Sequence, residues 1–270
     1  MKVSVIIPVL NKLHYTKQCL GDLKHIKEKN IEIIIINNAS TDETSDYLSN
    51  LEGIKVLTNN QNKGCAASWN QGIKKSTGEW IAILNNDVRI EPNCFDTLIK
   101  SAESLSIDVI SPGMREGKLD YNFHEYAELY TQKMKNVYRN CNPSGVCFIL
   151  KTKVFEKVGL FDENFVIGQY EDADFFRRCK LLKFRMGIIG SSFIHHFGST
   201  TQKDLQKNAE TNYSLHNRTY HRKKWKIGFT QRHYERYRDQ FQTFLWSKKE
   251  FFRYGHSLLE KSENGKIRYF

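Results

Sequence analysis

Short apolar runs alternate with segments of helical periodicity over the first 200 residues. The runs rich in Ile, Val and Leu predict strands at Lys2–Pro8, Ile31–Ile36, Ile54–Thr58, Trp80–Leu84, Ile107–Ser111, Gly145–Leu150 and Arg185–Phe193. Apolar positions spaced by three and four predict helices at Tyr15–Lys29, Gly64–Lys75, Pro92–Ser104, Thr152–Val158 and Glu171–Leu182. This alternation predicts an α/β fold with a mostly parallel central sheet flanked by helices.

Two further segments complete the expected secondary structure. Ser40-Thr41-Asp42-Glu43 fits a capping box, with Ser40 as the N-cap and Glu43 as the third helical residue. Residues 113–143 are polar and aromatic without a clear period, and we expect them to form an irregular excursion over the site.

The most informative strand is Trp80–Leu84, which is wholly apolar and runs into Asn85-Asn86-Asp87. Such a strand fits a parallel sheet that is covered on both faces. Ligands bind at the carboxyl ends of strands in these sheets, so Asp87 would face a crevice. A carboxylate there suits Mg²⁺ or Mn²⁺ holding a diphosphate. A simple turn is the alternative, since Asn and Asp favour turns.

An acidic cluster, Glu171-Asp172-Ala173-Asp174, opens the last predicted helix. Acids in a first turn are stabilised by the helix dipole in any protein, so they need no functional explanation. However, residues 165–170 form an apolar, glycine-containing approach to this helix, which indicates a loop that presents the acids to a cleft. A carboxylate in that place could take a proton from a hydroxyl nucleophile as a general base.

His195 and His196 follow the last predicted strand, where a sheet opens toward a ligand. Neutral imidazole is a common metal ligand, although polar histidines at a strand end are the simpler explanation. The sequence contains neither GxGxxG nor GxxxxGK[ST], so it indicates neither a dinucleotide fold nor a P-loop NTPase. The 6 cysteines are scattered without a Cys-x-x-Cys pair, which favours reduced thiols in a cytoplasmic protein.

Basic charge is concentrated near the C-terminus of the 270 residues. Residues 203–270 hold 16 Lys and Arg against 7 Asp and Glu, a net +9 out of +11 for the chain. No apolar run approaches the roughly 18 residues of a membrane helix. We therefore expect a catalytic domain over residues 1–200 and a basic, aromatic-rich helical extension over residues 201–270.

The sequence is compatible with several partners for this extension. A solvated helical face is favoured, and an anionic membrane surface or the acceptor comes next, which would make the protein peripheral at the inner face of the membrane. Interleaved aromatics and cations can also contact nucleic acid, the least favoured of the three.

The ordered set of motifs resembles family 2 inverting glycosyltransferases, in particular the branch that builds bacterial surface polysaccharides and includes rhamnosyltransferase-like members. The matching pieces are Val5 to Asn11, Asn37 to Asp42, Asn62-Lys63-Gly64 through Gly72, Leu84 to Asp87, Gly159 to Glu163, Glu171 to Asp174 and His196-Phe197-Gly198-Ser199. They cover about residues 2–200 in register.

This resemblance implies a GT-A fold, a nucleotide-diphosphate sugar donor and Mn²⁺ or Mg²⁺. Asp87 and His196 would hold the metal, with Asp172 as the base, and Glu171, Asp174 and His195 as secondary or acceptor-binding candidates. The implied donor-binding residues are Pro8, Val9, Asn11, Asn37, Asn38, Lys63, Gly64, Asn85 and Asn86. Asn38 stands where many relatives have an acid, which leaves the base open, with UDP- or dTDP-linked sugars favoured.

The implied reaction is inverting transfer of the sugar to a hydroxyl of a glycan, lipid-linked or protein-linked acceptor. A sugar nucleotidyltransferase is the enzymatic alternative, but Pro8-Val9-Leu10-Asn11-Lys12 replaces the glycine-rich basic loop of those enzymes. A non-catalytic protein that binds nucleic acid through the basic extension is the other alternative.

Overall fold

The computed structural model describes residues 2–26, 30–198, 212–263 and 266–269. Its strands are β1 (Val3–Val9), β2 (Ile31–Asn37), β3 (Lys55–Thr58), β4 (Trp80–Leu84), β5 (Val88–Ile90), β6 (Val109–Glu116), β7 (Tyr138–Arg139), β8 (Cys147–Lys151), β9 (Met186–His196), β10 (Leu259–Glu263) and β11 (Lys266–Tyr269). Its helices are α1 (Leu13–Lys24), α2 (Thr44–Ser49), α3 (Gly64–Lys75), α4 (Cys94–Ser104), α5 (Phe123–Met134), α6 (Lys153–Val158), α7 (Glu171–Leu181), α9 (Tyr213–Lys224) and α10 (Phe229–Tyr254).

One sheet organises the molecule, with the order β11-β10-β6-β8-β4-β1-β2-β3. Strands β3, β2, β1 and β4 are parallel neighbours, and β8 lies antiparallel between β4 and β6. Strands β9 and β10 both pair parallel with β6, while β5 and β7 pair antiparallel with β9. Most strands therefore point the same way, and the predicted mostly parallel sheet is confirmed.

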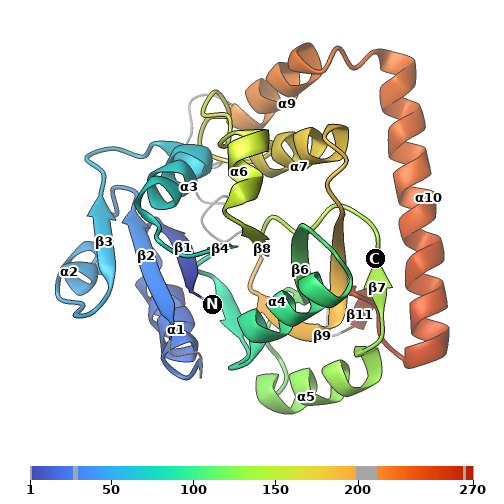
Figure 1. Cartoon of the computed structure of the whole chain (residues 1–270), viewed down its shortest axis with the longest axis horizontal. Helices are drawn as coiled ribbons and strands as arrows, with labels where there is room; N and C mark the ends of the chain where they lie inside the picture. The colour runs from blue at the N-terminus through green and yellow to red at the C-terminus, as the bar shows by residue number, and fades with distance from the viewer. Residues whose placement is uncertain (1, 27–29, 199–211, 264–265, 270) are drawn as a thin grey trace.

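Helices cover both faces of this sheet (Figure 1). Alternate residues of β1 enter different cores: Val5 and Ile7 pack with the apolar faces of α1 and α4, whereas Ile6 packs with α3, α6 and α7. This division follows from the two-residue period of a strand. The carboxyl ends of β1, β2 and β4 lie at the same edge of the sheet because these strands are parallel neighbours, and the candidate residues follow those ends.

Several element boundaries differ from the expectation. Helix α1 ends at Lys24, and residues 27–29 of the predicted helix lie outside the described residues. The capping box is wrong: α2 begins at Thr44, and Asp42 Oδ1 accepts the Thr44 backbone N–H at 3.0 Å. Ser40 is not an N-cap, because its Oγ accepts the backbone N–H of Asn11 at 2.8 Å.

The expected irregular excursion at residues 113–143 is also wrong. It contains the second half of β6, helix α5 and strand β7. Asn122 caps α5, accepting from the backbone N–H of His124 at 3.1 Å. The buried residues of α5 follow one another at spacings of four, three and four, and they are Phe123, Ala127, Tyr130 and Met134.

The C-terminal extension is only partly helical. After α9 and α10 the chain returns to the sheet, where Leu259–Glu263 pairs parallel with β6 and antiparallel with β11. The expected boundary at residues 200–201 lies outside the described part of the chain. None of the described helices combines the length and apolarity needed to span a bilayer.

Candidate active site

The acid expected to bind metal lies where β4 ends. Asn85, Asn86 and Asp87 connect β4 directly to β5, and Asp87 is only 6% exposed. Asn86 Nδ2 donates to Thr16 Oγ1 at 2.9 Å, so this amide is used inside the protein. The Asp87 backbone oxygen accepts the Phe197 N–H at 3.0 Å, which holds Asp87 beside the end of β9.

His196 lies between two carboxylates. Its Nε2 is 3.4 Å from Asp87 Oδ1, and its Nδ1 is 3.3 Å from Glu116 Oε2. Burial lowers the pKa of His196, but the Asp87 and Glu116 carboxylates outweigh burial and raise this pKa to about 9. A cation binding at this site would displace the imidazole proton, since a metal takes the neutral ring.

These residues fit a divalent cation. His196 Nε2 is buried and makes no hydrogen bond, although it faces the Asp87 carboxylate. No group of three or more His, Cys, Asp or Glu side chains suited to a metal occurs within the described ranges. The pair would therefore form an open site, in which diphosphate oxygens and water complete the coordination, as Mg²⁺ prefers.

Glu116 was missed in the sequence, and it adds to this centre. Strands β6 and β9 are parallel, and their register pairs Glu116 with His196. A carboxylate on the second nitrogen of a metal-binding imidazole fixes the orientation of the ring. No local pattern around Glu116 signals this role, because its partner lies 80 positions away.

His195 points away from the Asp87 side, because neighbouring strand residues face opposite sides of a sheet. It is buried and its Nδ1 lies 2.8 Å from the Tyr121 hydroxyl. Burial lowers the pKa of His195 to about 4, so the ring is neutral. The structure therefore brings His196, and not His195, to Asp87. Both histidines lie within β9 rather than after it.

Asn38 is held by its own neighbours at the end of β2. Its Oδ1 accepts the Lys63 backbone N–H at 2.9 Å and Asn59 Nδ2 at 3.1 Å, and its Nδ2 donates to Asn62 Oδ1 at 2.6 Å. The side chain thus fixes the start of α3 against the strand. One amide hydrogen of Asn38 is left for a ligand.

Asn11 and Asn37 hold the loop that follows β2. Asn11 Oδ1 accepts the backbone N–H of Thr41 at 2.7 Å, and Asn37 Oδ1 accepts that of Ser40 at 3.0 Å. Asn11 takes a positive φ of 57°, a conformation that Asn tolerates better than most residues. These two amides therefore shape the expected nucleoside pocket, rather than presenting free groups to it.

The remaining expected donor-binding residues line the same edge of the sheet. Val9 is buried, and its backbone oxygen accepts the Asn38 N–H at 2.8 Å, while Pro8 is half-buried. Lys63 is exposed beside Gly64 at the start of α3. Gly64 has φ 82°, and a Cβ there would lie 2.8 Å from the Ile167 backbone nitrogen, so glycine is required.

Three of the candidate acids lie near Cys65, at the start of α3. Burial raises the pKa of the Cys65 thiol well above its usual value, and the charges of Glu171, Asp172 and Asp87 raise it further. Cys65 therefore lies within electrostatic reach of both the expected base and the expected metal ligand. Residues that follow β4 and residues at the start of α7 therefore lie near the same side chain.

Glu171 and Asp172 lie side by side in the first turn of α7. Asp172 Oδ1 accepts the Ala173 backbone N–H at 2.7 Å, and its Oδ2 packs against the space above Gly145. Burial, followed by the charge of Asp172, raises the pKa of Glu171 to about 8, and burial also raises the pKa of Asp172. Glu171 is thus mainly neutral at pH 7, and the two neighbouring acids together hold less negative charge than two free carboxylates would.

Asp174 is occupied by structural partners. It is fully buried, and its carboxylate contacts Arg178 Nε at 3.0 Å, Lys224 Nζ at 2.7 Å and Trp225 Nε1 at 2.9 Å. Lys224 also contacts Asp162 at 2.6 Å. These contacts attach α9 to α7, so Asp174 joins the extension to the catalytic part of the chain.

Asn217 of α9 was also missed, and it supports the loop that leads to Asp172. This loop is strained, with positive φ at Ile167, Gln169 and Tyr170. The Asn217 amide accepts the Val166 N–H at 3.0 Å and donates to the carbonyls of residues 166, 168 and 169 at 2.9, 2.7 and 3.1 Å. One buried side chain therefore bonds four backbone groups of this loop.

The comparison with known families decides the class of protein. Residues 4–159, more than half of the chain, match the family described as Glycosyl transferase family 2. The chain belongs to this family. The match favours family 2 over both alternatives that the sequence left open, the sugar nucleotidyltransferase and the non-catalytic nucleic-acid-binding protein.

Curated relatives are bacterial glycosyltransferases. GlyG of Streptococcus pneumoniae is 26% identical over 208 residues, which is 70% of this family 2 chain and 68% of GlyG. GlyA of the same organism is 25% identical over 182 residues, covering 62% of this chain but only 26% of GlyA. The chain thus spans about a quarter of GlyA.

Solved structures share the fold of this family 2 chain. GalNAc-T7 with UDP, GalNAc and Mn²⁺ matches with a TM-score of 0.59 at 14% identity, over 73% of this chain and 44% of that chain. The mannosyltransferase PcManGT from Pyrobaculum calidifontis, in complex with GDP-Man and Mn²⁺, matches with a TM-score of 0.55 at 15% identity, over 72% and 56%. The expected GT-A fold is confirmed.

Proposed function

We propose that this enzyme is an inverting, metal-dependent glycosyltransferase of glycan or surface-polysaccharide synthesis. It would move a sugar from a nucleotide-diphosphate donor to a hydroxyl of a glycan, lipid-linked or protein-linked acceptor. The observation that carries the proposal is the buried His196 Nε2, which faces Asp87 at 3.4 Å without a hydrogen bond. GalNAc-T7 with UDP and Mn²⁺, and PcManGT with GDP-Man and Mn²⁺, support donor and metal on the same fold.

Different residues would act on the leaving diphosphate and on the attacking hydroxyl. Asp87 and His196 would hold Mn²⁺ or Mg²⁺, which offsets the negative charge that grows on the departing diphosphate. Asp172 would accept the proton of the acceptor hydroxyl as its oxygen forms the new bond to the anomeric carbon. The C–O bond to the diphosphate breaks on the opposite face, so one displacement inverts the anomeric configuration.

The test of this function is release of nucleotide from sugar nucleotides in the presence of Mn²⁺. We expect hydrolysis or transfer with at least one of a panel of UDP-, dTDP- and GDP-sugars, and a rise in melting temperature with the same donor, because a bound ligand stabilises the folded state. UDP- and dTDP-sugars are favoured. EDTA-treated protein is the control. If no donor in the panel is bound or cleaved with Mn²⁺, the proposal is wrong.

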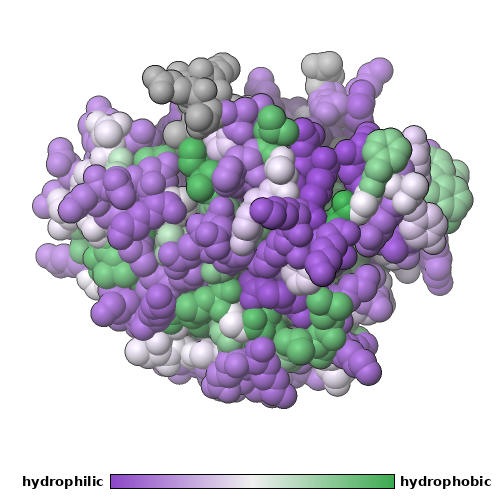
Figure 2. All heavy atoms as spheres, turned by 90° about the horizontal axis from the view of Figure 1, so that it is seen from above, coloured by the Kyte–Doolittle hydropathy of each residue, from purple (hydrophilic) through white to green (hydrophobic). Residues whose placement is uncertain are grey.

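We further propose that the enzyme works on the cytoplasmic side and touches an anionic membrane through α10. Tyr234, Tyr237, Phe241, Phe244 and Phe252 recur on one side of this helix, and each is at least 54% exposed. Ser247 and Glu250 are its buried residues. Glu250 lies about 2.5 turns from Phe241, so the aromatic stripe faces away from the protein. Figure 2 shows apolar rings among hydrophilic residues at the edge that α10 forms.

Charge favours a bilayer over a second copy as the partner of this stripe. Lys248 lies within the stripe, with its Nζ 5.6 Å from the Phe244 ring. Two such faces packed together would bring like charges together, whereas anionic headgroups complement them. Exposed aromatic rings flanked by Lys and Arg are typical of helices that lie in a membrane interface.

Sedimentation with vesicles tests this contact. We expect the protein to bind phosphatidylglycerol-containing vesicles and not pure phosphatidylcholine, and the double variant Phe241→Ser/Phe244→Ser to lose this binding. Leu181→Ser, at an exposed apolar residue of α7, is the control. Point variants are required because deletion of residues 229–270 would remove β10 and β11 from the sheet. Unchanged vesicle binding, or a dimer that depends on the same two residues, would refute it.

A further inference from the structure

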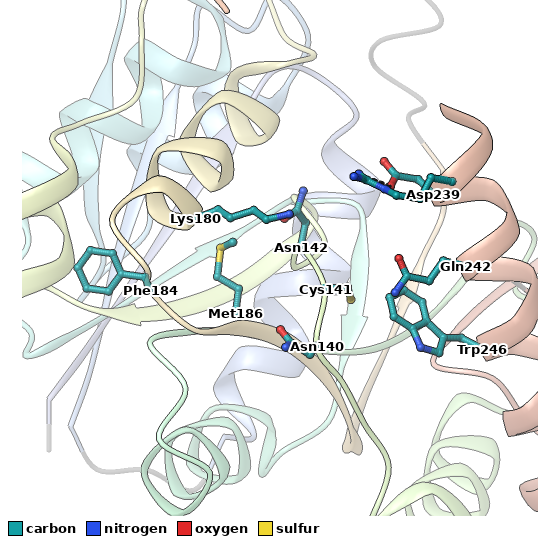
Figure 3. Close-up of a pocket in the computed structure, with 10 residues that line it drawn as sticks. Asn140, Cys141, Asn142, Lys180, Phe184, Met186, Asp239, Gln242 and Trp246 are labelled. Atoms are coloured by element: carbon teal, nitrogen blue, oxygen red, sulfur yellow. Dashed lines mark hydrogen bonds and ion pairs between the residues drawn. The ribbon is translucent and has the colours of Figure 1, made fainter. Parts of the chain in front are cut away.

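A cavity of 560 Å³ lies between α10 and the body of the molecule, apart from the expected donor site. One wall comes from the segment after β7 and contains Asn140, Cys141 and Asn142. The opposite wall is the side of α10 that carries Gln242 and Trp246. Figure 3 shows these two side chains on the α10 side of the cavity, across from Asn140 and Asn142, with Lys180 of α7 reaching in from the left.

The lining suits a polyhydroxylated ligand. Within the described chain no hydrogen bond joins the amides of Asn140, Asn142 or Gln242 to other groups, so their donors and acceptors stay available. An amide offers both donors and acceptors, as a sugar hydroxyl does. The Trp246 indole adds a rigid apolar surface with one N–H donor. Arg139 lies 5.2 Å from this ring and fixes it from one side.

The cavity connects to the catalytic residues through a short stretch of chain. Asn142 lines the cavity, and Gly145 lies against the Asp172 carboxylate. Three residues of extended chain span at most about 11 Å, so the cavity edge is close to the expected base. The next residue, Val146, accepts the Asn85 N–H at 2.9 Å and thereby reaches the segment before Asp87. Lys180 lies on the same helix as Asp172, about 12 Å further along it.

We propose that this cavity binds the glycosyl units of an oligosaccharide acceptor that lie beyond the attacking hydroxyl. The inference rests on the proposed function, in which Asp172 activates that hydroxyl. A ligand that extends from Asp172 along residues 140–145 would place its next sugar rings between the two amide-bearing walls. The extension would then contribute to acceptor choice through the inner side of α10, while its outer stripe meets the membrane.

Saturation-transfer NMR on the full chain with UDP and Mn²⁺ tests the site. The probes are a panel of neutral and uronic-acid-containing di- to tetrasaccharides. We expect at least one to bind, and Trp246→Ala to weaken its binding about tenfold by removing ring contact. Gln242→Ala should weaken it less. Phe252→Ala, on the outer side of α10, is the matched control and should bind as the wild type does.

Two outcomes overturn the inference. Binding of no saccharide in the panel would do so, as would binding that is equal in wild type, Trp246→Ala and Gln242→Ala. Nucleotide release from sugar nucleotides in Mn²⁺, measured on the same proteins, distinguishes failure of the cavity assignment from failure of the proposed transferase function. If release persists while saccharide binding is absent, only the cavity assignment fails. If release is absent, the proposed transferase fails as well, whatever the cavity binds.

Discussion

Asp172→Asn is expected to lower kcat by about 10²–10⁴-fold while donor and Mn²⁺ affinity stay near wild type. Asparagine keeps the shape of the side chain, and its oxygen can still accept the Ala173 N–H that Asp172 accepts at 2.7 Å. It cannot take a proton from the acceptor hydroxyl. An effect on kcat without an effect on donor binding is the pattern of a group that acts in the transition state. Steady-state transfer assays and calorimetric titration of donor measure the two quantities.

Glu171→Gln is the matched control for that substitution. Burial and the neighbouring charge raise the pKa of Glu171 to about 8, so the wild-type side chain is mainly neutral at pH 7, as Gln is. We expect Glu171→Gln to retain most of the turnover. Asp174→Asn should act on stability instead, because Asp174 is paired with Lys224 and Arg178. Near-normal turnover in Asp172→Asn with an inactive Glu171→Gln would move the base to Glu171.

The parts of the fold that the sequence predicted depend on local pattern. Helix α3 runs over Gly64–Lys75 and β4 over Trp80–Leu84, as expected, because a helical stripe and a wholly apolar run need no distant partner to be recognised. Helix α5 has a comparable spacing of apolar residues, at Phe123, Ala127, Tyr130 and Met134. The other aromatic residues around them made this helical period hard to recognise in the sequence. Strand β5 is only three residues long and follows Asp87 at once, too short for a period to appear.

Other features depend on pairing between distant segments of the chain, and the pattern of a single sequence does not show which segments pair. Strand β10 is rich in Lys, Glu and Ser, and its pairing with β6 makes it a strand. The same holds for the site. Strand ends and clustered acids pointed to Asp87, to the acids at 171–174 and to the histidine pair, and the family resemblance then singled out Asp172 and His196. Glu116 and Asn217 act on residues that are 80 and about 50 positions away, so only the folded chain brings them there.

Asp87→Ala is expected to abolish the enhancement of nucleotide-diphosphate binding by Mn²⁺ and to leave the fold intact. The side chain lies at a strand end and contacts His196 rather than the apolar cores, so its loss removes a ligand and little packing. Loss of an outer partner of a metal ligand alone costs about 10–100-fold in metal affinity, and loss of the ligand should cost at least that. Calorimetric titration of UDP with and without MnCl₂ gives the effect, and circular dichroism checks the fold.

The two adjacent histidines provide the internal control for this centre. His196→Gln should weaken the Mn²⁺ enhancement strongly, because it removes the Nε2 that faces Asp87 at 3.4 Å. His195→Gln should have a smaller effect, since His195 lies on the other side of the strand beside Tyr121, where an amide can replace its hydrogen bond. A larger effect from His195→Gln than from His196→Gln would shift the metal ligand by one residue. Asp87 is the carboxylate that faces His196 Nε2, whereas Glu116 contacts the other ring nitrogen, Nδ1. Full Mn²⁺ enhancement in Asp87→Ala would therefore show that Asp87 is not a metal ligand.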